Sequence, residues 1–236
     1  MTVGALQTII NMAETIEIDR RRVMGVQYTR SEVAKINETV TRNPWRFNIT
    51  VPAMMSYETG RALIETLDYL DRRYPEQVSF SSSQGASSGL SWMFAYQGQL
   101  TPQQLSGITI ESWTGTNMVL GNLPSVDPST IMFKVGDLIC PAEGAIPTTI
   151  VNYEIGVGSQ GSIRRGTDST VTVQVHRPNF SSFSNDYLGT ILVGNDCTFY
   201  MFCNNMPTYK INPGGSTGLI TWSGQFQFYE YTQQIL

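Results

Sequence analysis

Residues 221–236, TWSGQFQFYEYTQQIL, alternate large aromatic side chains with polar ones. Trp222, Phe226 and Phe228 fall on one face of an extended chain, with serine and glutamine residues on the other. A period of two with aromatic residues on one face predicts a half-buried β-strand. Such a strand needs a partner strand elsewhere in the sequence.

The partner that the pattern favours is NPWRFNITVPAMM, residues 43–55. Trp45 and Phe47 share a face there with Ile49 and Val51, while polar residues take the other face. We expect the two stretches to lie side by side in one antiparallel sheet, where cross-strand aromatic pairs add about 0.2 to 1 kcal/mol each. The expected aromatic layer of this core consists of Trp45, Phe47, Trp222, Phe226 and Phe228.

One helix is predicted, in SYETGRALIETLDYLDRRYPEQ at residues 56–77. Its apolar residues recur at spacings of four, three and four, the period of an amphipathic helix, at Leu63, Leu67, Leu70 and Tyr74. Ser56 can cap the start and Pro75 stops the helix, which limits it to about residues 56–74. We expect Leu63 and Leu67 in the core, because a single helix among strands covers an open face of a sheet.

The remaining sequence is typical of β-structure. The first forty residues alternate loosely and predict two or three strands. From about Thr101, short β-stretches are divided by turn residues about every eight to twelve positions, a pattern that suits a small barrel or sandwich. The expected fold is therefore mainly β: an antiparallel β-sandwich with one covering α-helix from residues 1–103 and 179–236, and an inserted small β-barrel-like module from residues 104–178.

Composition limits the classes of function. The chain has 236 residues, of which 41% are apolar and 14% are charged, with a net charge of −4. The apolar content excludes disorder, and no run is long enough for a membrane span. The N-terminal stretch lacks the pattern of a secretory signal, so we expect synthesis in a cytosol. A surface poor in charge favours packing against other copies or other proteins, and three lysines without a basic stripe argue against nucleic acid as a partner.

No catalytic constellation emerges from the sequence. His176 is expected to be a hydrogen-bonded or exposed strand-end residue, because no nucleophile stands in a recognisable motif. Carboxylate pairs such as Asp68 with Asp71, or Glu14 with Glu17, arise by chance on helices and strands. The three cysteines, Cys140, Cys197 and Cys203, are expected to be reduced core residues. We therefore expect no enzyme activity, no metal and no cofactor.

An arginine cluster, Arg20, Arg21 and Arg22, is followed by NPWRFNITVPAMM and by the helix with its continuation into QVSF. A module carrying FKVGDLI then precedes a return through MPTYKINPGG and LITWSGQFQFYEY. In the order of these parts the sequence resembles a family of structural proteins of tailed bacteriophages, the distal-tail or baseplate-hub ring proteins. The resemblance covers nearly the whole chain and depends on pattern and order.

The resemblance implies a homo-oligomeric ring, a hexamer in this family, that joins the tail tube, the hub and other baseplate proteins. It places the protein in the virion, in the phage tail or baseplate, after assembly in the host cytoplasm. No membrane and no sequence-specific nucleic acid would take part. The three consecutive arginines, Arg20, Arg21 and Arg22, cannot all point inward from an extended segment, which makes them the expected subunit interface.

Two other functions fit the sequence. The chain could be a subunit of the tail tube or its initiator, which also assembles through repeated contacts between copies. Alternatively, the aromatic-rich β-module could bind carbohydrate, with Trp92 or Trp113 stacking on a sugar. The exposure of these two rings distinguishes the carbohydrate-binding class, because a sugar site needs at least one accessible aromatic ring.

Overall fold

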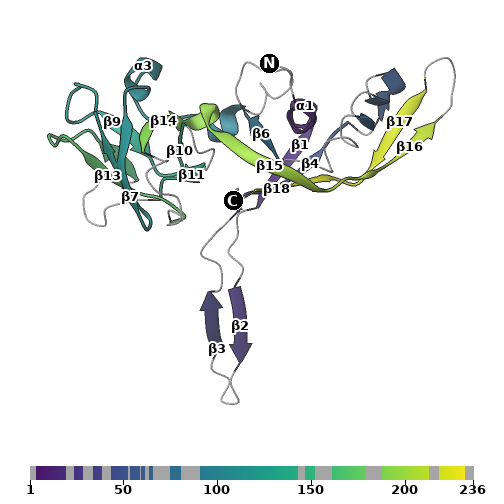
Figure 1. The fold of residues 1–236 in the computed structure, drawn as a ribbon, viewed down its shortest axis with the longest axis horizontal. Helices are drawn as coiled ribbons and strands as arrows, with labels where there is room; N and C mark the ends of the chain where they lie inside the picture. Colours follow the sequence, from purple (N-terminus) through teal and green to yellow (C-terminus); the bar gives the residue numbers. More distant parts are fainter. Residues whose placement is uncertain are drawn as a thin grey trace.

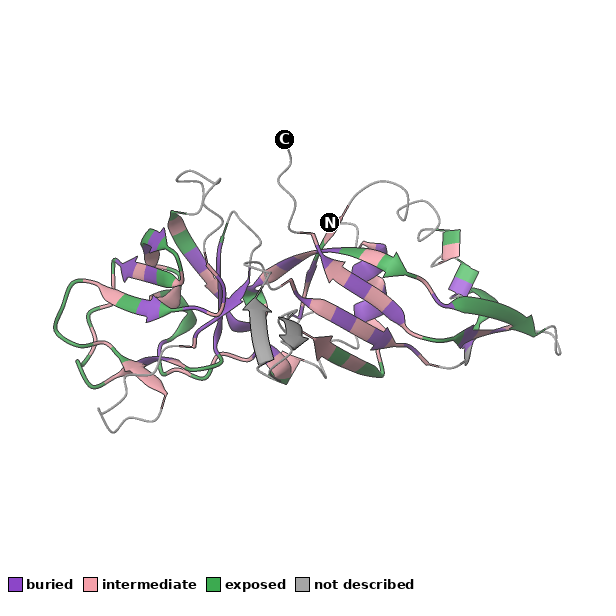
Figure 2. Ribbon diagram, turned by 90° about the horizontal axis from the view of Figure 1, so that it is seen from below, coloured by how far each residue is buried: buried purple, intermediate pink, exposed green. Residues whose placement is uncertain are grey.

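The structure is a computed structural model that describes residues 4–19, 24–28, 34–38, 44–52, 54–58, 60, 61, 64, 65, 75–80, 91–142, 147–151, 161–178, 188–212 and 218–231. Within these residues the chain is mainly β, and its strands pair antiparallel (Figure 1). The two largest sheets are each associated with a hydrophobic core of their own. Figure 2 shows how buried positions gather along these sheets.

The first large sheet has five strands in the order β1 (Thr15–Asp19), β4 (Arg46–Thr50), β18 (Phe226–Glu230), β15 (Thr198–Asn205) and β6 (Glu76–Ser79). Phe228 pairs with Phe47, and Phe226 pairs with Ile49. The expected antiparallel pairing of the stretch around residue 47 with the C-terminal stretch is therefore confirmed. β18 lies in the middle of the sheet, with β4 on one side and β15 on the other.

The C-terminal stretch forms two strands, which corrects the expectation of a single one. β17 (Leu219–Ser223) ends before Gly224, whose φ of 108° lies in a region that favours glycine, and β18 begins at Phe226. Trp222 thus belongs to a separate three-stranded sheet in the order β16 (Thr208–Asn212), β17 and β5 (Met54–Ser56). Its ring still packs on Phe226, with 5.2 Å between the ring centroids, because the break turns the chain without separating the two side chains.

Helix α1 (Ala5–Asn11) occupies a position where strand was expected. Its residues Leu6, Ile9 and Ile10 are buried in the core of the five-stranded sheet. The carboxylate of Glu76 in β6 accepts hydrogen bonds from the backbone N–H groups of Ala5 and Leu6, at 3.3 and 2.9 Å. These donors have no partner within the helix, so a residue far away in the sequence completes its N-terminus.

The same helix covers the free edge of β6. The side chain of Gln7 accepts a hydrogen bond from the backbone N–H of Ser79 at 2.8 Å and donates one to its carbonyl oxygen at 3.0 Å. An amide side chain thus takes the place of a neighbouring strand. Edge strands that are covered in this way cannot pair with another chain.

The helix predicted at residues 56–74 is described only at residues 57, 58, 60, 61, 64 and 65, all of which are helical. Leu63 and Leu67 lie outside the described residues. Gly60 is buried, and a Cβ atom added there would lie 2.5 Å from Cδ1 of Ile220 in β17 and 3.2 Å from the sulfur of Met55 in β5. The helical segment therefore approaches the three-stranded sheet closely at this glycine.

The second large sheet has six strands in the order β11 (Thr148–Thr149), β10 (Leu138–Pro141), β14 (Gly189–Val193), β7 (Thr109–Thr114), β8 (Asn117–Gly121) and β13 (Val171–Gln174). It is accompanied by a two-stranded sheet of β9 (Ile131–Lys134) and β12 (Ser162–Arg164) and by the short helix α3 (Pro102–Leu105). β14 comes from the range 179–236, so the strands of this sheet do not stay within residues 104–178.

The remaining strands, β2 (Met24–Tyr28) and β3 (Ala34–Glu38), form a two-stranded ribbon. Figure 1 shows this ribbon projecting away from both large sheets, with the three-stranded sheet and the six-stranded sheet at opposite ends of the molecule. The strands expected in the first forty residues are thus β1, β2 and β3, one in the five-stranded sheet and two in the ribbon.

Candidate functional site

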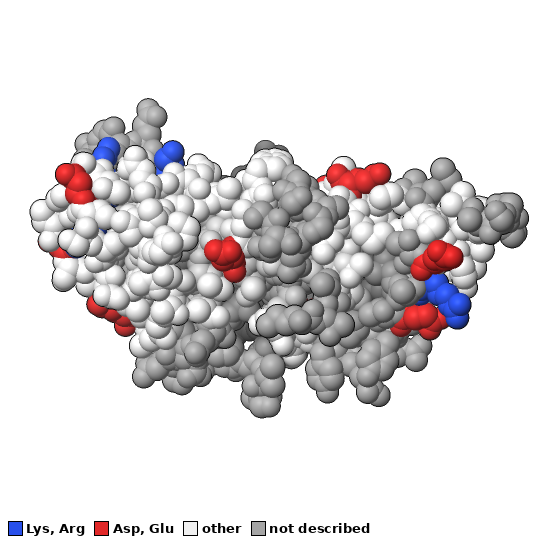
Figure 3. Space-filling model, turned by 90° about the horizontal axis from the view of Figure 1, so that it is seen from above, with Lys and Arg blue, Asp and Glu red and all other residues white. Residues whose placement is uncertain are grey.

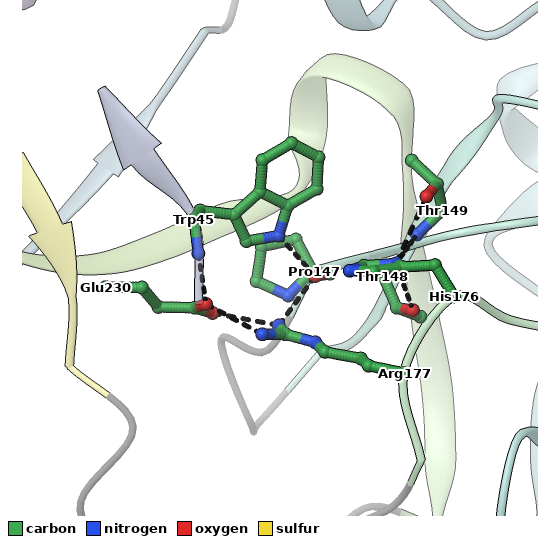
Figure 4. Close-up of polar contacts among 7 residues, drawn as sticks. All are labelled: Trp45, Pro147, Thr148, Thr149, His176, Arg177 and Glu230. Atoms are coloured by element: carbon green, nitrogen blue, oxygen red, sulfur yellow. Dashed lines mark hydrogen bonds and ion pairs between the residues drawn. The ribbon is translucent and has the colours of Figure 1, made fainter. Parts of the chain in front are cut away.

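A cluster of hydrogen-bonded polar groups lies where the two large sheets meet (Figure 4). Arg177, just after β13, forms a double hydrogen bond with Glu230 at the end of β18, with N–O distances of 2.7 and 2.8 Å. Arg177 also donates to the carbonyl oxygen of Pro147 at 2.6 Å. Both charged side chains are buried, so the ion pair joins the two halves of the molecule out of contact with solvent.

Trp45 is hydrogen-bonded to the same two residues as Arg177, namely Glu230 and Pro147. Its backbone N–H donates to Oε2 of Glu230 at 3.0 Å, and its indole Nε1 donates to the carbonyl oxygen of Pro147 at 2.9 Å. The ring packs edge-on against Phe199 and Phe94 in the first core, at 5.5 and 5.9 Å between centroids. A single side chain thus takes part both in the aromatic core and in the polar junction.

Desolvating an ion pair is costly, and the cost is recovered only when geometry and additional hydrogen bonds are good. Here both carboxylate oxygens of Glu230 accept hydrogen bonds, one of them from Arg177 and from Trp45 together. The two-pronged geometry of a guanidinium on a carboxylate also fixes the relative orientation of the two groups. The arrangement holds β18 and the segment after β13 in one fixed position.

His176 lies beside this pair. Its Nδ1 accepts a hydrogen bond from the backbone N–H of Thr149 at 2.9 Å and lies 3.0 and 3.1 Å from the hydroxyl oxygens of Thr148 and Thr149. The ring stacks edge-on against Trp45 at 5.6 Å. Both threonines are buried, so the contact between hydroxyl and imidazole is not presented to solvent. The geometry orients the ring at the junction.

A second polar cluster fixes the loops around β9. Asp137 is buried and accepts hydrogen bonds from the backbone N–H groups of Gln97 at 2.9 Å and Lys134 at 2.8 Å. Burial raises the pKa of its carboxyl group, and these two hydrogen bonds oppose the rise. The hydroxyl of Tyr96 donates to the carbonyl oxygen of Met132, and burial raises the pKa of Tyr96 to about 12.

The other residues weighed in the sequence are dispersed. Glu17 lies in β1, where it accepts a hydrogen bond from Asn48, and Glu14 directly precedes this strand. Asp68 and Asp71 lie outside the described residues. Cys140 and Cys197 are buried and Cys203 is half-buried.

The described part of the chain holds no group of three or more histidine, cysteine or acidic residues placed to bind a metal ion. None of its helices is both long enough and apolar enough to cross a membrane.

The surface carries few charges and several large apolar side chains. Figure 3 shows charged side chains scattered thinly over the face it presents. Trp92 is 74% exposed, whereas Trp113 is buried in the second core. Ile211 and Tyr209 of β16 are also exposed. The expected interface residues Arg20, Arg21 and Arg22 lie outside the described residues.

Arg177 and Glu230 were not expected from the sequence, although a signal for them exists. In FQFYE, residues 226–230, the buried positions alternate, and Glu230 follows Phe226 and Phe228 on the buried face. Arg177 likewise continues the buried parity of Val173 and Val175. A charge at a buried position requires a partner of opposite sign, but parity does not say which residue that partner is.

Comparison of the sequence with protein-family models and with curated proteins finds no match to either.

Proposed function

We propose that the protein is a structural component of a bacteriophage tail that forms a ring at the distal tail or baseplate and joins the tail tube, the hub and other baseplate proteins. The observation that carries the proposal is the surface, which is poor in charge and exposes large apolar side chains on Trp92, Tyr209 and Ile211. Interface cores are depleted in charge and enriched in aromatic residues. Such a surface is more typical of a subunit that contacts other proteins than of a monomer.

The internal architecture supports the same role. The polar groups of the junction, Arg177, Glu230 and Trp45, use their hydrogen bonds to connect the two halves of the chain. A ring component fixes the positions of its neighbours relative to one another, which requires a rigid connection between its own parts. We further infer that the five-stranded sheet, together with the segments packed on it, forms a β-sandwich with a covering helix, and that the six-stranded sheet is the inserted barrel-like module.

In this proposal the subunits form a homohexamer. Rings arise from contacts between two different surfaces of the same chain when the rotation between copies closes. Arg20, Arg21 and Arg22 of one copy would meet acidic residues of the next, among them Glu14 and Glu17. Charge pairs of this kind fix register and choice of partner more than affinity.

The experiment that tests the proposal is the mass and symmetry of the purified protein. Multi-angle light scattering gives the mass, and negative-stain imaging gives the symmetry. Sixfold rings support the distal-ring function, whereas stacked rings or filaments favour the tail-tube alternative. A monomer at the highest soluble concentration contradicts both.

The carbohydrate-binding alternative retains one aromatic candidate. Trp113 is buried, whereas Trp92 exposes 74% of its surface and could stack on a sugar. Glycan-array binding that is lost in a Trp92→Ala variant would replace the ring proposal with this one. If the wild type binds no glycan on the array, the ring proposal remains the better account.

A further inference from the structure

His176 is the only histidine of the chain, and its half-buried ring lies at the junction of the two large sheets (Figure 4). Histidine is the side chain whose charge ordinarily changes between pH 5 and 8. Any effect of mild acid on the junction therefore has a candidate group in this one ring.

The contacts of the ring define which nitrogen carries its hydrogen. Nδ1 accepts a hydrogen bond from the backbone N–H of Thr149 at 2.9 Å, so this nitrogen is the unprotonated one. In a neutral imidazole the other nitrogen, Nε2, then carries the hydrogen. The proton that is added in mild acid must consequently go to Nδ1, the atom that now accepts the hydrogen bond.

A protonated Nδ1 is a donor, and two donors cannot form a hydrogen bond with each other. The backbone N–H of Thr149 would then face a positively charged ring in place of its present acceptor. The hydroxyl oxygens of Thr148 and Thr149, at 3.0 and 3.1 Å, could accept the new hydrogen, but the backbone N–H would still face the charged ring. The folded arrangement therefore opposes protonation of this histidine.

The segment held by this hydrogen bond also carries the contact between the two large sheets. The carbonyl oxygen of Pro147, two residues before Thr149, accepts hydrogen bonds from Arg177 at 2.6 Å and from the indole of Trp45 at 2.9 Å. Trp45 belongs to the core of the five-stranded sheet. A displacement of residues 147–149 would therefore weaken both hydrogen bonds that reach Pro147.

The same segment links the two outermost strands of the six-stranded sheet, β11 and β13. The backbone N–H of His176 donates to the carbonyl oxygen of Thr149 at 3.0 Å, and that of Val151 donates to Gln174 at 2.8 Å. The imidazole thus lies where β11 meets the continuation of β13. Displacement of β11 would loosen this link together with the junction.

We propose that His176 is a pH-sensitive latch: the neutral ring holds residues 147–149 in place, and protonation of Nδ1 releases them and loosens the contact between the two large sheets. The opened or unfolded chain binds the proton more readily than the closed structure does. The latch therefore contributes fully above the pH at which an unfolded histidine titrates, about 6.5, and its contribution is lost as the pH falls below that value. The inference does not depend on assembly into a ring.

Other charged groups around the latch do not produce the same effect. Among the described residues, Arg177 and Glu230 form a bidentate pair, so their charges offset each other. Before β10, which pairs with β11, the carboxylate of Asp137 accepts hydrogen bonds from the backbone N–H groups of Gln97 and Lys134. Burial raises the pKa of Asp137, so its titration stabilises the folded protein as the pH falls and opposes the loss expected from His176.

The test compares the wild type with His176→Asn, whose amide oxygen can take the place of Nδ1 as acceptor but does not titrate. Hydrogen exchange read by mass spectrometry, corrected for the intrinsic exchange rate at each pH, measures the protection of the segments around Thr149 and Trp45. Between pH 7.5 and 5.5 we expect about a tenfold loss of protection in the wild type, a factor of ten for one pH unit below the histidine value. We expect no such loss in His176→Asn, nor in β16 and β17, which lie at the opposite end of the molecule from the six-stranded sheet (Figure 1).

Nuclear magnetic resonance of the single imidazole provides a second measurement that needs no variant. The ring ¹⁵N shifts of the wild type should show hydrogen on Nε2 at pH 7.5, and the ring should become half protonated only below about pH 6.5. Constant protection in the wild type, or an equal loss of protection in His176→Asn, overturns the inference. Hydrogen on Nδ1 at pH 7.5, or half protonation at or above pH 6.5, also overturns it, and this result decides if His176→Asn does not fold.

Discussion

Phe47 of β4 lies directly opposite Phe228 of β18, and both side chains are fully buried. The ring of Phe47 also packs edge-on against Phe199 and Phe80, at 5.2 and 5.6 Å between centroids. This pair therefore connects the centre of the five-stranded sheet to the strand β15 and to the segment that follows β6. The core depends on a contact between two segments that are distant in sequence.

Replacement of Phe47 or Phe226 by alanine should lower the free energy of unfolding by about 3 to 5 kcal/mol, as large-to-small changes in a core do. Both side chains are completely buried in the same cluster. Urea unfolding measures the change. Phe202→Ala, at a residue that is 36% exposed, is the control and should cost much less. Near-wild-type stability of both core variants would contradict a common core.

Removal of one member of the junction pair should be strongly destabilising. Glu230→Gln leaves Arg177 buried without its counter-charge, a change that costs about 3 to 5 kcal/mol in comparable buried pairs. The double variant Arg177→Met, Glu230→Leu should recover much of this loss, because no buried charge remains. Urea unfolding of Arg177→Met, of Glu230→Leu and of the double variant gives the coupling energy of the pair. A single variant as stable as the wild type would show that the pair does not hold the junction.

Stability should fall at alkaline pH partly through Tyr96. The pKa of this phenol is raised from 10.0 to about 12 in the folded protein, so the folded state holds its proton more tightly than the unfolded state. The stabilisation is fully present below pH 10 and is lost as the pH rises towards 12. Unfolding curves between these pH values should be less steeply pH-dependent for Tyr96→Phe than for the wild type. Identical pH dependence would contradict the prediction.

A chain truncated after Gly224 should not fold. The truncation removes β18, whose two neighbours, β4 and β15, would then lose the strand between them. Soluble expression and circular dichroism check this outcome. A chain that ends at Tyr231 keeps all of β18 and serves as the control. A folded protein from the shorter chain would show that β18 is dispensable.

The double variant Arg20→Ala, Arg21→Ala should keep its melting temperature within a few degrees and fail to assemble. Burying an unpaired charge is costly, so we expect these arginines to meet solvent or acidic groups of a neighbouring subunit. Light scattering and incorporation into phage particles by complementation measure the effect. Normal assembly would place the interface elsewhere, and unfolding would assign the arginines a structural role.

The pairing of β4 with β18 was predictable because alternation over five residues fixes both the strand and its buried face. The break at Gly224 was not, since glycine within such a pattern is compatible with a bulge, a bend or an end. Helix α1 was missed for two reasons: seven residues contain only two turns, too few for a clear period, and its N-terminal hydrogen bonds come from Glu76, about seventy residues away.

The junction shows the same limit. Parity places Glu230 and Arg177 on buried faces, but sequence alone does not identify which buried charge meets which. Local patterns report how a segment meets the core; they carry little information about distant partners. The fold class and the central strand pair were therefore accessible, whereas the contact between the two large sheets was not.

The central position of β18 has a consequence for the order of folding. Trp45 and Glu230, which are hydrogen-bonded at the junction, are separated by 185 residues. On the ribosome, β4 is made early, whereas its partner β18 emerges only when nearly the whole chain has been synthesised. The six-stranded sheet draws on residues 109–193 alone and can form in the meantime. Non-local pairing of this kind is slow, so we expect newly made chains to pass through a state in which the aromatic face of β4 is not yet covered by β18.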